Sequence, residues 1–396
     1  MMTIFGYGKT TKAIVEKFGN CKVYDDKFSA VTFDKKGNEF LPSSMFDENK
    51  STLEVTSPGI PPSNHLIKKA KNLISEYDLF CDTMPYSIWI TGTNGKTTTT
   101  NMLQHLLEKR GSVEGGNVGN PLAKLDKNAS IWILETSSFT LHYTNKAVPN
   151  LYVILPISPD HISWHGSFEE YEKAKLKPLD TMLEGEAVLL PKKYKDYKTD
   201  AFKIIYETSE DLAKYFDIDI NKINFQEPFL IDSLLALAIT KILFDEVDYE
   251  KINDFKIGKH RVEEFTDKLG RTWINDSKAT NADATIAALA GYAGKDINLI
   301  LGGDDKGADL TPLFEKMKNK TIKIFAIGAN ADKLNKLCEI YNYPCKVCHT
   351  LENAVNHMDK EGLSSINLLS PAAASLDQFS SYAQRGDEFK ELVNAL

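Results

Sequence analysis

The segment "ITGTNGKTTTT", Ile90 to Thr100, has the form of a phosphate-binding loop that follows a strand and opens a helix. Residues 87–90 predict the strand, and apolar side chains at helical spacing predict the helix, at Met102, Leu103, Leu106 and Leu107. Glycines allow backbone N–H groups to turn toward phosphate oxygens, and the helix adds its positive N-terminus. The strict motif has a glycine where Ile90 stands, so this loop is shortened, and a Gly/Thr turn with a surface lysine is the alternative.

We predict from this context that the loop binds ATP together with Mg²⁺. In loops of this type the lysine contacts the β- and γ-phosphates and the following hydroxyl holds magnesium, which assigns these roles to Lys96 and Thr97. The predicted ATP contacts of the loop are Gly92, Thr93, Asn94, Gly95, Lys96, Thr97 and Thr98.

Length and composition favour a globular protein of two or three domains, because the chain has 396 residues, 42% of them hydrophobic and 26% charged. No apolar run approaches the roughly 18 residues of a membrane helix, and the first residues lack the pattern of an export signal. The net charge of −8 offers no general attraction for nucleic acid or an anionic membrane. We therefore expect a cytoplasmic monomer that binds small molecules, with no nucleic-acid or membrane partner.

Short apolar runs alternate with helical stretches along the whole chain, which predicts α/β domains with mostly parallel sheets. We expect three domains: a Rossmann-like domain at 1–85, a central P-loop-type ATPase domain at 86–258, and a Rossmann-like C-terminal domain at 259–396. Polar residues follow many of the predicted strands, at the sheet edge where α/β proteins bind ligands. They are Thr91, Glu135, Asp160, His161, Asp276, Asp304 and Ser370.

A weaker motif lies near the start of the chain, where "GYGKTT" at Gly6–Thr11 follows a predicted strand. Asp25 and Asp26 come about 20 residues later, as in dinucleotide-binding folds, but Thr11 stands where the third glycine belongs. A domain that holds some other nucleotide is better supported than NAD binding, and a plain βαβ turn is the remaining alternative.

The chain resembles the Mur ligases, ATP-dependent amino-acid ligases of peptidoglycan synthesis. The resemblance covers the whole chain in family order, through "SPGI", "GTNGKTT", "GGNVGNP", "ETSSF", "SPDHISWHGSFEEYEKAK", "HRVE", "NDSKATN", "GGDDKGAD" and "SPAAASLDQF". "NDSKATN" and "SPAAASLDQF" are most similar to the members of the family that add D-glutamate. The Asp-Asn-Pro-Arg signature of the relatives that add diaminopimelate does not occur in the sequence.

The resemblance implies a ligase that adds D-glutamate to UDP-N-acetylmuramoyl-L-alanine through an acyl phosphate, with ATP and two Mg²⁺ ions, releasing ADP and phosphate. A related Mur or folylpolyglutamate-type ligase that joins a different amino acid is one alternative. A non-catalytic nucleotide-binding protein is another.

The resemblance also implies roles for individual residues. The expected catalytic residues are Lys96, Glu135, His161, Lys175 and Lys278. Thr97 would hold the first magnesium ion, and Glu135, His161 and a carbamylated Lys175 the second. In the third domain, Arg261 and Lys278 would lie near the ATP phosphates and Asp276 at the ribose. The expected contacts with the nucleotide sugar and with D-glutamate are Thr10, Ser57, Asn117, Thr280, Lys306, Ser375, Leu376 and Tyr382.

Three of these residues have ordinary alternatives. Glu135 would otherwise be a surface carboxylate and His161 a loop histidine. Lys175 matches the lysine of the family pattern Y-x-x-A-K, but a solvated helix lysine is possible in so charged a segment. Lys173 and Lys177 lie close by, so a slip in the alignment would select one of them instead. Carbamylation needs a neutral amine, which burial favours.

The sequence departs from the family at three positions. Asp305 stands where glycine is common, so it adds a negative charge that either weakens the D-glutamate site or pairs with Lys306. Tyr382 replaces a phenylalanine. Lys27 replaces an arginine near the uracil and lacks the planar guanidinium.

The segment "CKVCH" at Cys345–His349 spells a haem-attachment pattern, and Cys338 nearby suggests zinc. Haem attachment requires export, for which there is no signal, so we predict that Cys338, Cys345 and Cys348 are buried free cysteines. All five cysteines are expected to be free thiols, in agreement with a reducing compartment.

Overall fold

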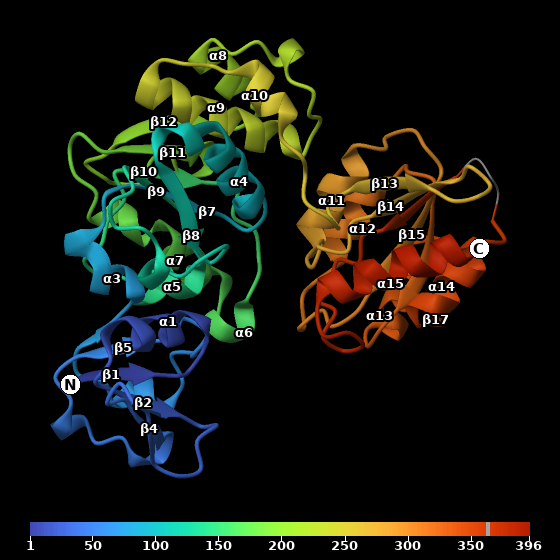
Figure 1. Cartoon of the computed structure of the whole chain (residues 1–396). Coiled ribbons are helices and arrows are strands. Elements are labelled where there is room, and N and C mark those ends of the chain that lie inside the picture. The colour runs from blue at the N-terminus through green and yellow to red at the C-terminus, as the bar shows by residue number, and fades with distance from the viewer. Residues whose placement is uncertain (362–364) are drawn as a thin grey trace. The chain divides into compact units, whose positions relative to one another are not determined.

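The computed structural model describes residues 1–361 and 365–396. They form two compact units, one of Met1–Asn224 with Leu230–Phe255 and one of Phe225–Phe229 with Lys256–Leu396. Three six-stranded sheets, built from strands within residues 2–74, 86–206 and 263–369, confirm the predicted α/β class with mostly parallel sheets (Figure 1). The domain boundaries near residues 85 and 258 stay predictions.

The first sheet has the order β3-β4-β2-β1-β5-β6, and only the β3–β4 pair is antiparallel. Buried apolar side chains on the central strands, such as Ile4, Val23 and Val55, form its core. Its strands are β1 (Met2–Phe5), β2 (Cys21–Asp25), β3 (Thr32–Phe33), β4 (Glu39–Pro42), β5 (Glu54–Thr56) and β6 (Leu73–Ile74). Its helices are α1 (Lys9–Phe18) and α2 (His65–Lys69).

The second sheet is entirely parallel, in the order β12-β11-β10-β7-β9-β8. Its strands are β7 (Tyr86–Thr91), β8 (Ser112–Gly116), β9 (Ile131–Glu135), β10 (Leu151–Ile154), β11 (Ala187–Pro191) and β12 (Phe202–Tyr206). Helices of this part are α3 (Glu76–Phe80), α4 (Lys96–Leu107), α5 (Ser138–Tyr143), α6 (Ile162–His165), α7 (Phe168–Leu176), α8 (Ser209–Phe216), α9 (Phe229–Phe244) and α10 (Tyr249–Asp254).

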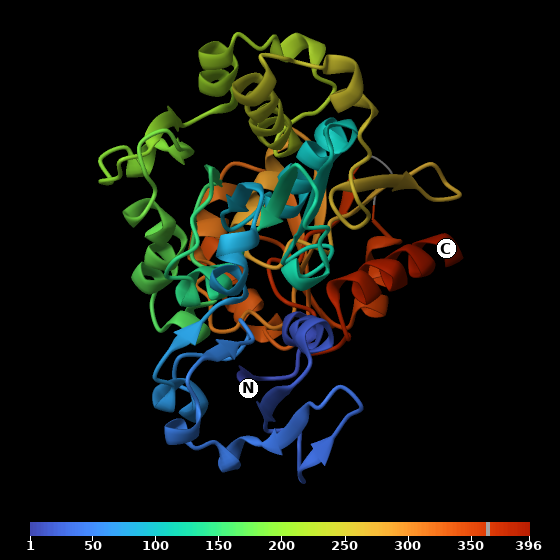
Figure 2. The ribbon, with the colours of Figure 1, turned by 60° about the vertical axis from the view of Figure 1, so that its left-hand side comes forward.

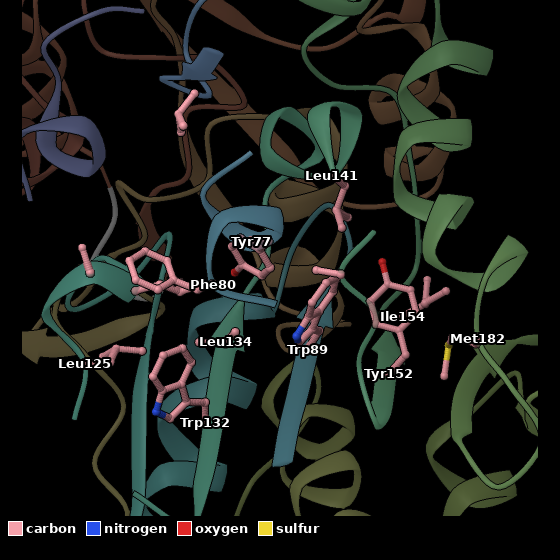
Figure 3. Packing of buried hydrophobic residues seen from close by; sticks show 14 of the residues in the cluster. Tyr77, Phe80, Trp89, Leu125, Trp132, Leu134, Leu141, Tyr152, Ile154 and Met182 are labelled. Atoms are coloured by element: carbon pink, nitrogen blue, oxygen red, sulfur yellow. The ribbon is translucent and has the colours of Figure 1, made fainter. Parts of the chain in front are cut away.

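A cluster of large side chains holds the second sheet together (Figure 3). Trp89 on β7 and Trp132 on β9 are buried, and the ring of Tyr77 meets Trp89 edge to face at 4.8 Å between centroids. Strands buried on both faces need near-continuous apolar sequence, which explains the run at 131–134. The cluster fixes β7 and β9, whose carboxyl ends carry Thr91 and Glu135.

The third sheet has the order β13-β14-β18-β15-β16-β17, with β13 antiparallel to β14. Its strands are β13 (Glu263–Thr266), β14 (Thr272–Asn275), β15 (Ile297–Gly302), β16 (Ile322–Ile327), β17 (Cys345–His349) and β18 (Ile366–Leu369). Its helices are α11 (Ala282–Ala290), α12 (Thr311–Met317), α13 (Ala331–Tyr341), α14 (Leu351–Met358) and α15 (Tyr382–Ala395), the last two packed side by side (Figures 1 and 2).

The "CKVCH" segment forms strand β17, and this argues against haem attachment through both of its cysteines. Cys345 packs against the core cluster that contains Cys338, whereas Cys348 belongs to the separate cluster of Trp273 and Phe389. Residues an odd number of positions apart on a strand point to opposite faces of the sheet. All five cysteines are free, as predicted, and Cys338 and Cys348 are buried, but Cys345 is only half-buried.

No helix among residues 1–361 and 365–396 is long and apolar enough to cross a bilayer.

Candidate active site

The predicted phosphate loop is a tight four-residue turn between β7 and α4, residues 92–95, called the phosphate turn below. Gly92 has φ +142°, and a Cβ there would lie 2.4 Å from the Cβ of Leu155. Gly95 caps α4 with φ +83°. Positive φ angles and this close approach require glycine at both positions. Ile90, where the strict motif has glycine, is fully buried inside β7, so the shortened loop reflects a strand that continues one residue further.

Lys96 folds back over this turn. Its Nζ donates hydrogen bonds to the carbonyl oxygens of Gly92 at 2.9 Å and Thr93 at 2.7 Å. The ammonium therefore lies beside the turn whose N–H groups and helix N-terminus suit an anion.

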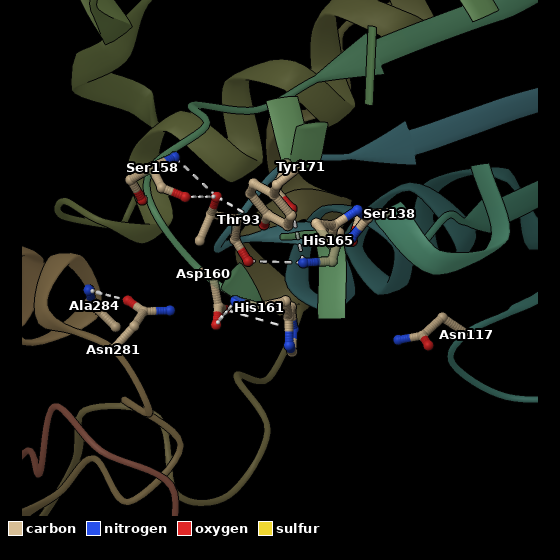
Figure 4. Close-up of polar contacts among 12 residues, drawn as sticks. Thr93, Asn117, Ser138, Ser158, Asp160, His161, His165, Tyr171, Asn281 and Ala284 are labelled. Carbon is tan, nitrogen blue, oxygen red and sulfur yellow. Dashed lines mark hydrogen bonds and ion pairs between the residues drawn. The ribbon is translucent and has the colours of Figure 1, made fainter. Parts of the chain in front are cut away.

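Thr93 ties the turn to the loop that follows β10 (Figure 4). Its Oγ1 accepts a hydrogen bond from the Ser158 N–H at 2.9 Å, lies 3.0 Å from the Ser158 carbonyl oxygen, and lies 3.1 Å from the Tyr171 hydroxyl. The sequence suggested phosphate contact for Thr93 but not this bracing. Ser158 and Tyr171 were missed because nothing in their local sequence indicates which turn they reach.

Lys175 on α7 is the lysine that points at the phosphate turn. It is 1% exposed, and its Nζ donates to the Gly92 carbonyl at 2.8 Å and to Thr91 Oγ1 at 3.3 Å. Burial, and next the charge of Lys96, lower the pKa of Lys175 well below its usual range, which favours the neutral amine. The solvated-lysine alternative is therefore wrong.

The neighbouring lysines lie elsewhere. Lys173 is exposed and lies 3.9 Å from Glu170, and Lys177 donates to the His142 carbonyl and to Asn145 Oδ1. The geometry thus favours Lys175 over a shifted alignment.

Glu135, the last residue of β9, is 2% exposed, so the surface-carboxylate alternative is wrong. Its Oε1 accepts a hydrogen bond from Asn117 Nδ2 at 2.6 Å, and the Asn117 N–H donates to the Glu135 carbonyl at 2.9 Å. Oε2 is buried and has no hydrogen-bond partner among the described residues. A buried carboxylate oxygen without a donor is costly, and a hard cation such as Mg²⁺ would satisfy it.

His161 lies in the loop after β10, seven residues beyond Ile154, and does not follow the strand directly as its sequence position suggested. Its backbone is left-handed, its N–H donates to Asp160 Oδ1 at 2.8 Å, and its Nε2 lies 3.6 Å from Asp160 Oδ2. Within the described ranges, no three His, Cys, Asp or Glu side chains gather closely enough to hold a metal by themselves. A magnesium site would need the Thr97 hydroxyl or a modified Lys175 in addition.

Thr10 lines a small cleft between the first-sheet segment and helices α3 and α5, together with Thr56, Pro58, Ser75, Glu76, Thr140 and Tyr143. Ser57 directly precedes Pro58, and its Oγ would be 3.3 Å from a Cβ on Gly8. Asp25 accepts hydrogen bonds from the N–H groups of Tyr7 at 2.6 Å and Lys27 at 2.8 Å. The acidic residue of the dinucleotide-like motif therefore braces its own turn.

The second compact unit carries the remaining predicted residues. Asp276 is buried, accepts hydrogen bonds from Ser370 Oγ at 2.7 Å and the Val262 N–H at 3.2 Å, and burial raises its pKa to about 7. Lys278 places its Nζ 5.2 Å from the ring centre of Tyr382.

Arg385, which the sequence did not single out, is 1% exposed beside these residues. It donates to Ser277 Oγ at 3.0 Å and to the carbonyls of Ser277 at 2.8 Å and Ala373 at 3.1 Å. A charged residue in a polar helical segment gives no sign that it is buried.

The loops that carry Lys306 and Ser375 lie side by side, because Asp304 and Ala374 exchange two backbone hydrogen bonds of 2.9 Å. Ser375 is buried, and Lys306 and Thr280 are exposed. The Leu376 side chain is 66% exposed, so only its backbone is suited to a carboxylate. Asp305 does not pair with Lys306: it binds Lys333 Nζ at 2.8 Å, and its extra charge is neutralised there.

Comparison with known proteins shows a match to the Mur ligase middle domain over residues 90–227. The chain is 53% identical to the UDP-N-acetylmuramoylalanine–D-glutamate ligase of Campylobacter jejuni over the full length of both proteins. The enzyme of the same name from Helicobacter pylori strain J99 is 44% identical over 99% of each chain. The chain belongs to the Mur ligase family.

Solved structures of other Mur ligases share its fold. The MurF ligase of Thermotoga maritima in complex with ADP matches this Mur ligase with a TM-score of 0.58 at 15% identity, over 88% of this chain and 89% of that one. The UDP-N-acetylmuramate-alanine ligase MurC from the same organism gives a TM-score of 0.58 at 14% identity, over 98% of each.

The packing of the phosphate turn predicts that Gly92→Ala damages this Mur ligase more than Gly185→Ala does. Both glycines have positive φ, but space is open around Gly185, whereas Leu155 blocks Gly92. We expect about 1 kcal/mol of lost stability for Gly185→Ala and at least about 3 kcal/mol for Gly92→Ala, with loss of ADP binding. Thermal unfolding and calorimetric ADP titration measure both. Equal ADP affinity of the two variants would contradict the packing argument.

The lowered pKa of His165 predicts that the folded protein loses stability in acid. Burial, followed by the charges of neighbouring residues, lowers its pKa from 6.5 to about 4, and its Nε2 lies 3.0 Å from Ser138 Oγ. As the pH falls from 6.5 toward 4, the unfolded chain binds a proton that the folded protein does not, so the free energy of unfolding decreases. Urea unfolding at several pH values measures how the free energy of unfolding depends on pH. In the variant His165→Gln, whose side chain can still reach Ser138, this dependence should be weaker between pH 6.5 and 4. An unchanged slope would exclude His165 as its source.

Proposed function

We propose that this chain is an ATP-dependent, ADP-forming ligase that joins D-glutamate to UDP-N-acetylmuramoyl-L-alanine in peptidoglycan synthesis. The relatives named for this activity, at 53% and 44% identity over essentially the full length, support the substrate pair. One observation in the structure carries the chemistry: Lys96 Nζ and Lys175 Nζ both donate to the Gly92 carbonyl oxygen, at 2.9 and 2.8 Å. The carboxylates of Asp160 and Glu135 act in the opposite direction from Lys96 on the pKa of Lys175, since they raise it. Cations and carboxylates thus meet at the phosphate turn.

The reaction requires that anions meet. A carboxylate oxygen of the nucleotide sugar bonds to the γ-phosphorus of ATP as the bond to the leaving ADP breaks, and the amine of D-glutamate then attacks the acyl phosphate carbon and expels phosphate. Positioning and charge neutralisation carry most of phosphoryl transfer. In our proposal Lys96 and the N–H groups of residues 92–98 hold the ATP phosphates.

Two magnesium ions complete the proposal, with Thr97 at the first and Glu135, His161 and carbamylated Lys175 at the second. Glu135 Oε2, which is buried and has no hydrogen-bond partner within the described part of the chain, supports the second position. Bound magnesium would neutralise phosphate charge. Asn117 holds the Glu135 carboxylate in place and, in the proposal, also contacts the nucleotide sugar.

The remaining assignments follow the family pattern. We assign Arg261 and Lys278 to phosphates and Asp276 to the ribose. Thr10 and Ser57 would contact the nucleotide sugar. D-Glutamate would be held by Thr280, Lys306, Ser375, the Leu376 backbone and Tyr382. The hydrogen-bonded pair Asp304 and Ala374 supports this assignment, because it brings the loops of Lys306 and Ser375 together. We further propose a cytoplasmic monomer without a nucleic-acid partner, which the net charge of −8 supports.

Phosphate release tests the function directly. With ATP, Mg²⁺ and UDP-N-acetylmuramoyl-L-alanine, we expect release with D-glutamate and little with L-glutamate, L-lysine or glycine. Lys96→Ala should lower the rate at least about 100-fold, because it removes a cation from the phosphates. Release that depends equally on another amino acid would replace the D-glutamate assignment, and an unchanged Lys96→Ala rate would end the catalytic one.

Carbamylation of Lys175 has a matched control on the same helix. Lys175→Ala should lower kcat at least about 100-fold, because a metal ligand is lost, whereas the exposed Lys173→Ala should stay within about twofold. Protein labelled with ¹³C-bicarbonate should show one carbamate carbon signal by NMR, absent only from Lys175→Ala. A signal that persists in Lys175→Ala would move the modification elsewhere.

A further inference from the structure

Asp232 is a buried carboxylate that none of the assigned roles uses. It lies in the first turn of α9 and is 3% exposed. Its Oδ1 accepts a hydrogen bond of 2.9 Å from Thr99 Oγ1, one turn into α4. A carboxylate that is nearly inaccessible to water needs a strong structural or functional reason, because burying its charge is costly.

The same oxygen presses against the phosphate turn. A Cβ on Gly95 would lie 2.5 Å from Asp232 Oδ1, so the carboxylate fills the space beside the capping residue of α4. Thr99 completes the arrangement, since its N–H and its hydroxyl lie 2.9 and 3.2 Å from the Gly95 carbonyl oxygen. Gly95, Thr99 and Asp232 therefore lock one another in place.

The charge of Asp232 matters at this position. The N-terminal turn of an α-helix carries partial positive charge, and Asp232 lies in the first turn of α9 while touching the capping residue of α4. The carboxylate is stabilised by these helix ends. It also lowers the positive potential that α4 offers to a polyphosphate.

We propose that Asp232 is a positioning residue for the ATP phosphates, which holds the turn at Gly95 in shape through Thr99 and weakens the binding of nucleotide in the absence of a divalent cation. The inference rests on the proposed ATP site, and it adds a residue that tunes how strongly nucleotide binding depends on magnesium. Removing the charge while keeping the shape should strengthen metal-free binding. Removing the side chain should loosen the turn.

Two variants separate charge from shape. Asp232→Asn keeps an acceptor for Thr99 and loses the charge, so metal-free ADP should bind about threefold to tenfold more tightly by calorimetry, with kcat within about threefold of wild type. Asp232→Ala loses the acceptor as well, and the KM for ATP should rise about tenfold while kcat changes less.

Asp211→Asn is the matched control, because Asp211 is also a carboxylate in the first turn of a helix, α8, where it accepts hydrogen bonds from the N–H groups of Glu207 and Thr208. Its ADP affinity should equal that of wild type. If Asp232→Asn binds metal-free ADP no more tightly than wild type, the inference is overturned, even where Asp232→Ala fails to fold. A wild-type protein that binds ADP but releases no phosphate with D-glutamate would refute the proposed function and leave this test valid.

Discussion

The contact between Gly92 and Leu155 is the constraint on which the rest of the candidate site depends. With 2.4 Å between a would-be Cβ and the Leu155 Cβ, the turn after β7 must follow the backbone that leaves β10. That proximity allows Thr93 to bind Ser158 and brings the loop with Asp160 and His161 beside the phosphate turn. Two neighbouring strands thereby deliver phosphate-binding and metal-binding candidates to one sheet edge.

The net charge of −8 is unfavourable for binding polyphosphates, so the charges at this edge of the second sheet must compensate for it locally. Lys96 and Lys175 both donate to the Gly92 carbonyl, and two ammonium groups this close oppose one another. The resulting neutral tendency of Lys175 is what carbamylation requires. Glu135 and Asp232 supply negative charge. One Glu135 oxygen has no hydrogen-bond partner in residues 1–361 and 365–396, and Asp232 lies against the capping residue of α4.

In the second compact unit, too, carboxylates are paired with cations. Arg271 binds Asp267 and Asp359 at 2.6 and 2.7 Å, and Asp305 binds Lys333, so each carboxylate has a nearby cation. Asp276 accepts hydrogen bonds from a hydroxyl and an N–H, and burial raises its pKa to about 7 although the charges of Arg261 and Arg385 act in the opposite direction. A carboxyl group held in this state is suited to exchanging hydrogen bonds with a ligand hydroxyl.

The sequence by itself determined the class of fold and the phosphate turn, because glycine spacing and apolar strand runs act locally and need no distant partner to be recognised. It also indicated Glu135, which directly follows a predicted strand, whereas the metal-binding roles of Glu135 and Lys175 came only from resemblance to a family. Tertiary structure alone decided that Lys175 and not Lys173 reaches the turn, that Asp305 pairs with Lys333, and that Arg385 and Asp232 are buried. These outcomes depend on which helix face meets which loop, and contacts between residues such as Asp305 and Lys333, 28 positions apart, or Thr99 and Asp232, 133 positions apart, leave no pattern in a single sequence.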